Sequence, residues 1–182
     1  MDFLNFLISG LSLGSVYAII ALGYTMVYGI AKMLNFAHGD VIMVGGFIVY
    51  YTVSMSGLPE WLGIIISVIG CTVLGVVIER LAYRPLRGAT PLAVLITAIG
   101  VSYLLQNLAL LIFKADTKSF QSVVHLPAIK IGSGELTITG ETIVTIAACI
   151  IIMIFLTLFV NKTKPGRAML AVSEDRGAAQ LM

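Results

Sequence analysis

Two groups of polar side chains interrupt an otherwise apolar chain, and they are the first candidates for chemistry. Asn35, His38 and Asp40 share one short turn between two apolar stretches, and Gln106 and Asn107 are neighbours inside another stretch. Such groups can line a polar path through a membrane, or they can cap helices and bond between them. For the turn we favour capping, with His38 as a hydrogen-bonded packing residue. For Gln106 and Asn107 we favour bonding between helices over contact with a solute.

The sequence carries none of the common hydrolase motifs. It has no G-x-x-x-x-G-K-S/T loop for nucleotides, no G-x-S-x-G nucleophile elbow and no H-E-x-x-H zinc pair. His38 and His125 are far apart in sequence. Cys71 and Cys149 both lie in apolar stretches, where we expect small packing residues and not a disulfide or a metal pair. We therefore predict no catalytic residue, no metal site and no enzyme activity.

Five long stretches without a charged residue define the class of protein. They cover residues 3–31, 41–59, 61–78, 88–113 and 142–161. A helix needs about 20 apolar residues to cross the hydrocarbon core of a bilayer. The composition agrees, since 59% of the residues are hydrophobic and 11% are charged, with a mean hydropathy of +1.04. We predict an all-α integral membrane protein with about five transmembrane helices, and 1–182 as a single transmembrane domain.

The basic residues predict how the chain is oriented. Arg80, Arg84 and Arg87 follow the third stretch, and segment 162–182 after the fifth is also rich in Lys and Arg. Such residues are retained on the cytoplasmic side, so we interpret the three arginines as topology anchors. The loop 114–141 balances its acidic and basic residues and is the expected periplasmic loop. This assignment places the N-terminus outside.

Two local patterns predict packing in the loop and in the first stretch. Residues 128–131 and 135–139 alternate around the sequence Gly-Ser-Gly at 132–134, which is typical of a small hairpin. In the first stretch, Gly10 and Gly14 are spaced as a small-xxx-small pair. That spacing favours close helix packing over a tilted helix or an interfacial lead-in.

The segment 162–182 is the expected cytoplasmic end of the chain. Pro165 and Gly166 are expected to end the exit of the fifth span, with a short helix after them. Ser173, followed by Glu174, suits the N-cap of a second helix. Composition alone favours a plain juxtamembrane connector over a docking element for a cytoplasmic partner.

Four segments, taken together, are specific to one family of membrane proteins. They are Leu34-Asn35-Phe36-Ala37-His38-Gly39-Asp40, residues 79–87, residues 95–102 and residues 166–179. In this order they resemble the LivH-type inner-membrane permeases of bacterial branched-chain amino acid ABC transporters. The resemblance covers essentially the whole chain. Permeases for urea and short amides look similar in the same segments.

The resemblance implies an ABC importer permease-like fold and a mechanism. A periplasmic amino-acid-binding protein delivers leucine, isoleucine or valine to the outer face. This chain and a LivM-like second permease form the path through the lipid bilayer of the bacterial inner membrane. Two cytoplasmic ABC ATPase subunits bind and hydrolyse ATP, so the permease itself needs no cofactor. No nucleic acid partner is implied.

The resemblance also gives segment 162–182 a role as a cytoplasmic coupling segment, in place of a plain connector. The candidate ATPase-coupling residues are Arg167, Glu174, Asp175, Arg176, Ala178 and Ala179. The three charged residues at 174–176 are expected to cap or pair at this joint, and the two alanines to permit close approach. Family permeases continue with further spans, so the resemblance implies that 1–182 is a partial, C-terminally truncated domain.

Two other classes of protein stay open at this point. A secondary transporter would show inverted repeats and carboxylates inside the membrane. The sequence places no Asp or Glu in the middle of a charge-free stretch, which argues against that class. A membrane scaffold without transport activity is the second alternative, and it predicts no ATP-dependent uptake with any partner.

Overall fold

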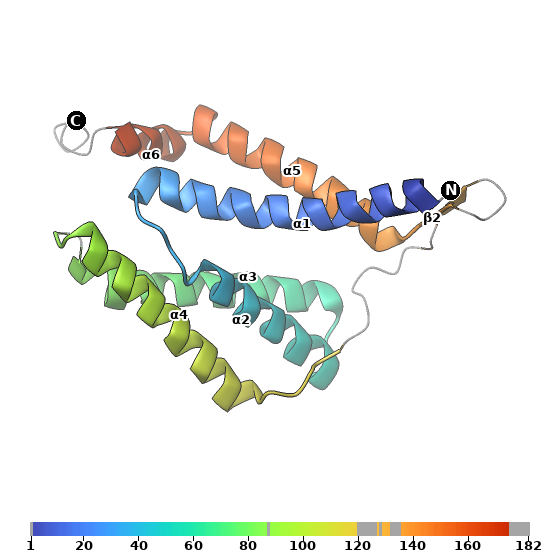
Figure 1. Cartoon of the computed structure of the whole chain (residues 1–182), viewed down its shortest axis with the longest axis horizontal. Coiled ribbons are helices and arrows are strands. Elements are labelled where there is room, and N and C mark those ends of the chain that lie inside the picture. Colours follow the sequence, from blue (N-terminus) through green and yellow to red (C-terminus); the bar gives the residue numbers. More distant parts are fainter. Residues whose placement is uncertain (1, 87, 120–126, 128, 132–135, 175–182) are drawn as a thin grey trace. The chain divides into compact units, whose positions relative to one another are not determined.

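The protein is described here by a computed structural model that covers residues 2–86, 88–119, 127, 129–131 and 136–174 (Figure 1). The chain divides into two compact units. Unit 1 combines residues 1–32 with residues 122–182, and unit 2 consists of residues 33–121. Each unit is considered by itself below.

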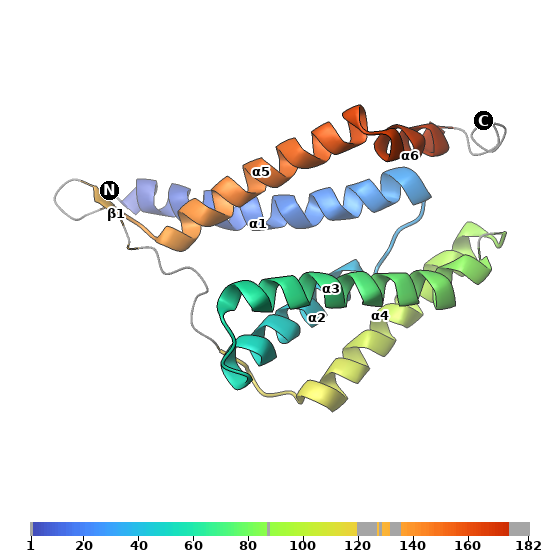
Figure 2. The ribbon, with the colours of Figure 1, turned by 180° about the vertical axis from the view of Figure 1, so that it is seen from behind.

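Unit 1 contains two long helices, a short hairpin and a terminal helix. These are α1 (Asp2–Ala31), β1 (Ile129–Ile131), β2 (Leu136–Ile138), α5 (Gly140–Lys162) and α6 (Lys164–Glu174). Helix α1 runs alongside α5, and α6 contacts both (Figures 1 and 2). The expected hairpin is present, because β1 and β2 pair antiparallel with Ile129 opposite Ile138. The turn at 132–134 lies outside the described residues.

Unit 2 is built from three helices with irregular turns at two of their ends. Its elements are α2 (His38–Tyr50), the π-helical η1 (Tyr51–Met55), α3 (Glu60–Ile78), the π-helical η2 (Glu79–Tyr83), the 3₁₀ turn η3 (Arg84–Leu86) and α4 (Pro91–Phe113). Helix α2 packs on α3 and also contacts α4. Thr90 caps α4, accepting a hydrogen bond from the Ala93 amide, and Pro91 occupies the first helical position.

Four of the described helices are long and apolar enough to cross a membrane. They are Phe3–Ile30, Glu60–Leu86, Pro91–Phe113 and Gly140–Lys162. The expected count of five is not confirmed, because the second helical segment, formed by α2 and η1, is not among these four. After η1 the chain turns at Gly57, whose φ of +61° suits glycine.

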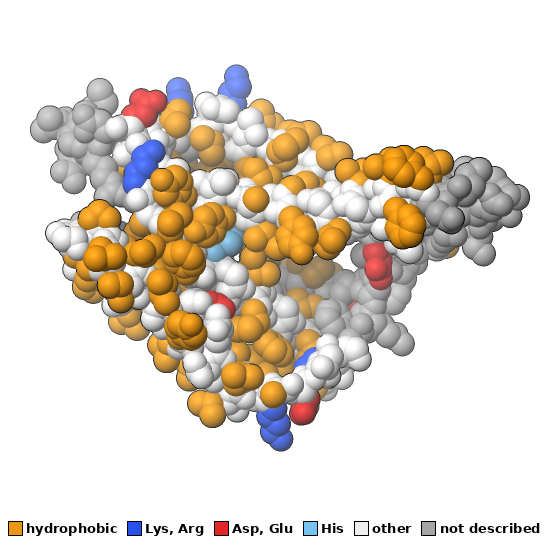
Figure 3. Space-filling model, in the orientation of Figure 1, with side chains coloured by type: hydrophobic (Ala, Val, Ile, Leu, Met, Phe, Trp, Pro, Cys, Tyr) orange, Lys and Arg blue, Asp and Glu red, His pale blue; other side chains and the backbone are white. Residues whose placement is uncertain are grey.

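Hydrophobic side chains cover much of the surface of both units, as expected for helices that face lipid (Figure 3). Leu111 in α4 and Phe155 in α5 are examples of large apolar side chains that are mostly exposed. The buried core of unit 2 is small by comparison. It centres on Ala37 and Ala98, which are fully buried, with Ile78, Tyr83 and Leu105 around them.

Helices α2 and α3 approach closely at glycine. A Cβ atom added at Gly45 would lie 2.9 Å from the Cys71 Sγ atom and 3.2 Å from the Ser67 Oγ atom. Both side chains bond to the α2 backbone, since Ser67 Oγ donates to the Gly45 carbonyl at 3.0 Å and Cys71 Sγ donates to the Val41 carbonyl at 3.5 Å. Cys71 therefore packs between helices, as expected from the sequence.

The close packing expected at Gly10 and Gly14 is not seen among the described residues. A Cβ atom added at Gly10 or Gly14 would meet no described atom within 4 Å. Spacing alone cannot distinguish the two cases, because a small-xxx-small pair forms a contact only where a neighbouring backbone lies against it. Within the described part of the chain, such a neighbour lies against Gly45 and none lies against Gly10 or Gly14.

Candidate functional site

A buried carboxylate joins helices α2 and α4. Asp40 lies in the first turn of α2 and its residue is only 7% exposed. Ser102 Oγ donates a hydrogen bond to Asp40 Oδ2 at 2.5 Å, and Gln106 Nε2 donates to Oδ1 at 3.0 Å. Gln106 Nε2 also lies 3.1 Å from Ser102 Oγ. Hydrogen bonds to an ionised carboxylate are stronger than neutral ones, so this cluster is a stable link between two helices.

The Asp40 side chain lies closer to the middle of a candidate span than its place in the sequence suggested. Ser102 lies at the middle of the 23-residue helix α4, and Gln106 is about one turn further along. Asp40 itself precedes the second charge-free stretch, but its side chain reaches the midpoint of a candidate span. A carboxylate is therefore held against the middle of a helix that is long and apolar enough to cross a membrane. Ionisable groups in such places are costly and usually mark functional sites.

Asp40 lies in the first turn of α2 but does not cap that helix. It is the third residue of α2, where free backbone N–H groups and the helix dipole are positive. The residue before the helix is Ala37, which has no side-chain oxygen to cap it. The capping role expected for Asp40 is not what the structure shows, because both carboxylate oxygens bond to α4 instead.

Asn35 organises the turn that leads into α2. Its Oδ1 atom accepts a hydrogen bond from the Ala37 amide at 3.1 Å, and its backbone carbonyl accepts one from the His38 amide at 3.2 Å. The same Oδ1 atom accepts a second bond from the Tyr83 hydroxyl at 2.6 Å. Asn35 thus braces the helix entry and ties it to η2. His38 opens α2 and is half-buried.

The two neighbouring amides of α4 behave differently. Gln106 bonds to α2 through Asp40, whereas Asn107 Nδ2 donates to the Tyr103 carbonyl of its own helix at 2.7 Å and is exposed. Adjacent residues on a helix point about 100° apart, so only one of the two can face α2. Bonding between helices is therefore seen for Gln106 and not for Asn107.

The expected coupling segment is described only in part. Arg167 and Glu174 lie on α6 and are exposed. Asp175, Arg176, Ala178 and Ala179 lie outside the described residues. Among the expected topology anchors, Arg80 in η2 and Arg84 in η3 are exposed, and Arg87 lies outside the described residues.

The joint between α5 and α6 is one residue long. Thr163 Oγ1 donates to the Phe159 carbonyl at 2.6 Å and accepts from the Gly166 amide at 3.1 Å, so one side chain caps both helices. Pro165 and Gly166 lie in the first turn of α6, which corrects the expectation that they end a helix. Ser173 also lies inside α6, where its hydroxyl bonds to the Leu170 carbonyl. The second helix expected after Ser173 falls on residues 175–182, outside the described residues.

Gly166 permits this tight joint. It is buried, and an added Cβ atom would clash with the carbonyl of Phe159 and lie 2.6 Å from the Val160 Cα atom. These neighbours are backbone atoms, which cannot rotate away as a side chain can. Only glycine fits at this position.

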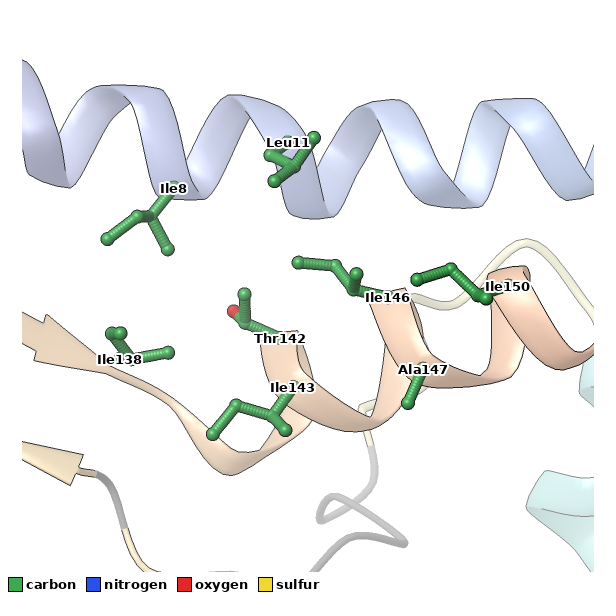
Figure 4. A pocket seen from close by; sticks show the side chains of 8 residues that line it. All are labelled: Ile8, Leu11, Ile138, Thr142, Ile143, Ile146, Ala147 and Ile150. Atoms are coloured by element: carbon green, nitrogen blue, oxygen red, sulfur yellow. The ribbon is translucent and has the colours of Figure 1, made fainter.

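An apolar cavity of about 380 Å³ lies between α1, β2 and α5 in unit 1 (Figure 4). Its lining residues are Ile8, Leu11, Ile138, Thr142, Ile143, Ile146, Ala147 and Ile150. The one hydroxyl among them, on Thr142, lies 2.9 Å from the Thr139 hydroxyl. The cavity offers shape but no charged group, so the polar site of unit 2 is the stronger functional candidate.

Two residues of the polar site, Tyr83 and Ser102, are not among the candidates picked from the sequence. Ser102 and Gln106 are spaced four apart, which puts two polar side chains on one face of an apolar helix. That spacing is a usable pattern for Ser102. Tyr83 gives no such pattern, because its partner Asn35 lies 48 residues away.

The chain was compared with known proteins. A family model described as "Branched-chain amino acid transport system / permease component" matches residues 6–182. The permease protein BraD of a high-affinity branched-chain amino acid transport system from Pseudomonas aeruginosa is 39% identical over 193 residues. The corresponding LivH proteins of Salmonella typhimurium and Escherichia coli K12 are 38% and 39% identical over 191 and 196 residues.

Each of these matches covers 99% of this chain and 62% of the relative, so the chain spans about 62% of the length of these curated relatives. No solved structure matches significantly. The family match and the four span-capable helices identify a multi-pass membrane protein. The chain belongs to the family of branched-chain amino acid transport system permeases.

Proposed function

We propose that this chain is a permease subunit of an ATP-driven importer in the bacterial inner membrane. Its solute would be a branched-chain amino acid or a related small molecule. The observation that carries the proposal is the identity of 38–39% along 99% of the chain to proteins named as branched-chain amino acid permeases. Because the chain spans 62% of those relatives, the activity of the whole transporter is part of the proposal.

The proposed partners follow from the same family. The chain would pair with a LivM-like second permease, two cytoplasmic ABC ATPase subunits and a periplasmic amino-acid-binding protein. The absence of a G-x-x-x-x-G-K-S/T loop from the sequence supports a separate ATP-binding subunit. In this arrangement the N-terminus and the hairpin lie outside, and α6 lies inside.

The polar site of unit 2 is the proposed wall of the translocation path. It brings Asp40 and Gln106 together, with Asn35 and His38 at the entry to the same helix. Asn107 faces another direction, and its part in the path is the weakest. Polar groups inside a membrane protein line water-filled cavities more often than they face lipid, which supports this assignment.

The proposed coupling segment is α6 with the residues after it. Its tight connection to α5 through Thr163 would let a push on α6 move α5. Reversing the charges at Glu174 and Arg176 together should abolish uptake while membrane insertion survives. Unchanged uptake in that double variant would show that these charges do not couple the ATPase to transport.

Uptake tests the function directly. The chain is expressed with the partner subunits and binding protein of its own genome, in bacteria that lack a branched-chain permease, and radiolabelled leucine uptake is measured. We expect uptake that disappears when the ATPase subunit carries an inactivating change. Excess unlabelled isoleucine and valine should compete, and excess urea or acetamide should not. Competition by the amides alone would indicate the related amide permeases, and uptake without the ATPase would indicate a secondary transporter.

A further inference from the structure

We propose that Asp40 and Ser102 form a binding site for the primary ammonium group of the transported amino acid. In this conformation the Gln106 amide occupies the place of that ammonium. The inference rests on the proposed function, since it concerns the solute of the same permease. It gives the cluster of Asp40, Ser102 and Gln106 a role in recognising the positive charge of the solute.

The geometry of Gln106 carries the argument. Its Nε2 atom lies 3.0 Å from Asp40 Oδ1 and 3.1 Å from Ser102 Oγ, so one nitrogen bridges two acceptor oxygens. An ammonium nitrogen at the same point would donate to both oxygens and keep a third donor for water or backbone. The Ser102 hydroxyl gives its own proton to Asp40 Oδ2, which leaves its lone pairs free to accept.

Charge makes the ammonium the better occupant. Among the described residues Asp40 is the only charged side chain that is buried. The amide of Gln106 is neutral, whereas an ammonium would neutralise the carboxylate in a medium of low dielectric constant. A zwitterionic solute brings the positive charge that this site lacks.

The three side chains of the site differ in their exposure. Gln106 is exposed and Ser102 is half-buried, whereas Asp40 lies behind them. Rotation of the long Gln106 side chain toward the exposed face would uncover Asp40 Oδ1 and Ser102 Oγ together. Gln106 therefore acts as a displaceable cover, which satisfies the carboxylate when no solute is present.

A matched pair of substitutions at the cover tests the proposal. Gln106→Lys places a tethered ammonium where the solute's ammonium would bind, and Gln106→Met has a similar length without charge or donor. Both are measured in the leucine uptake assay at saturating leucine, with the amount of each protein in the membrane determined by immunoblot. We expect the uptake rate of Gln106→Lys to be about tenfold or more below that of Gln106→Met, because only the lysine variant carries a tethered ammonium that competes with the solute.

Two further variants separate charge recognition from helix bracing. Asp40→Asn removes the charge but keeps an oxygen that can accept from Gln106, so it should lose uptake. Ser102→Ala removes one acceptor and keeps the charge, so it should retain part of the uptake. If Asp40→Asn transports normally while Ser102→Ala and Gln106→Met both fail, the cluster braces helices and the ammonium site is refuted.

The remaining outcomes are also decisive. Equal uptake by Gln106→Lys and Gln106→Met would refute the proposal, because a tethered ammonium would then not compete. If Gln106→Lys is missing from the membrane, normal uptake by Asp40→Asn refutes the site and lost uptake by properly inserted Asp40→Asn supports it. An absence of leucine uptake in the wild type would instead contradict the proposed function, and the ammonium site would fall with it.

Discussion

Unit 2 and unit 1 are both assembled from apolar helices, but they are held together in different ways. In unit 2, side chains reach from one helix to another and bond there, as Asp40 does with Ser102 and Tyr83 does with Asn35. In unit 1, hydroxyls such as those of Ser15 and Thr157 bond back to the carbonyl four residues earlier. Aliphatic side chains line the space between α1 and α5 (Figure 4).

The difference matters because lipid provides no hydrophobic force to press helices together. Association then depends on close van der Waals contact and on bonds between helices. In unit 2, close contacts and bonds between helices each involve a few identified side chains. Single substitutions of those side chains should therefore have specific effects. The α1–α5 contact is spread over many aliphatic atoms and should tolerate change, with the α5–α6 joint as the exception in unit 1.

The largest effect on stability is expected at the joint between α5 and α6. Gly166→Ala would drive a Cβ atom into the backbone of α5, so α6 could not keep its position. We expect a loss of about 3 kcal/mol in stability, measured by thermal unfolding of the purified protein in detergent. Gly14→Ala in α1 is the control, since its Cβ atom has open space and alanine favours helix. Equal unfolding temperatures for the two variants would show that the joint is not tight.

Neighbouring glycines in α2 give the next test, in unit 2. Gly45→Ala would press on Cys71 and Ser67, and we expect a cost of about 1–3 kcal/mol. Gly46→Ala has open space around it and should gain up to about 1 kcal/mol from helix propensity. The same unfolding measurement compares the two. A more stable Gly45→Ala variant would mean that α2 and α3 do not approach as described.

A smaller effect is expected from one bond between elements of unit 2. Tyr83→Phe removes the hydroxyl that donates to Asn35 Oδ1 and leaves that atom its bond to the Ala37 amide. We expect a loss of about 1 kcal/mol in unfolding free energy. Tyr103→Phe on the exposed side of α4 is the matched control and should change stability by less than about 0.5 kcal/mol. Equal losses of unfolding free energy in the two variants would show that the Tyr83 hydroxyl bond does not stabilise unit 2.

The smallest effect is expected at Asn107. Its amide bonds to the carbonyl of its own helix and is exposed, so Asn107→Ala should alter stability by no more than about 0.5 kcal/mol. Leucine uptake by this variant should also stay near that of the wild type. A loss of uptake comparable to that of Asp40→Asn would place Asn107 on the path and contradict the contrast with Gln106.

Much of the fold could be predicted from the sequence, because a helix that faces lipid has almost no charged residues along its length. Four of the charge-free stretches correspond to helices α1, α3, α4 and α5. The alternating pattern around 132–134 predicted the hairpin. The stretch 41–59 is the one that is not confirmed as a span, and it is divided between α2, the π-helical η1 and a turn at Gly57.

The site was less predictable, because its contacts join distant parts of the chain. Asp40 and Ser102 are 62 residues apart, and Asn35 and Tyr83 are 48 apart. The sequence could nominate Asn35, Asp40 and Gln106 as polar residues out of place in apolar surroundings. It could not show that the Asp40 side chain turns toward α4 and away from the start of its own helix. That choice depends on where α4 packs.

The π-helical segment η2 changes which side chains of the third span face in the same direction. Ile78 and Tyr83 are five residues apart, and both belong to the buried core of unit 2. In an α-helix, five residues turn the direction of a side chain by about 140° beyond a full circle, so the two would face different ways. A π-helix bonds residues five apart and brings them back into phase. The extra residue in the turn therefore lets Tyr83 face the same core as Ile78, where its hydroxyl donates to Asn35 Oδ1.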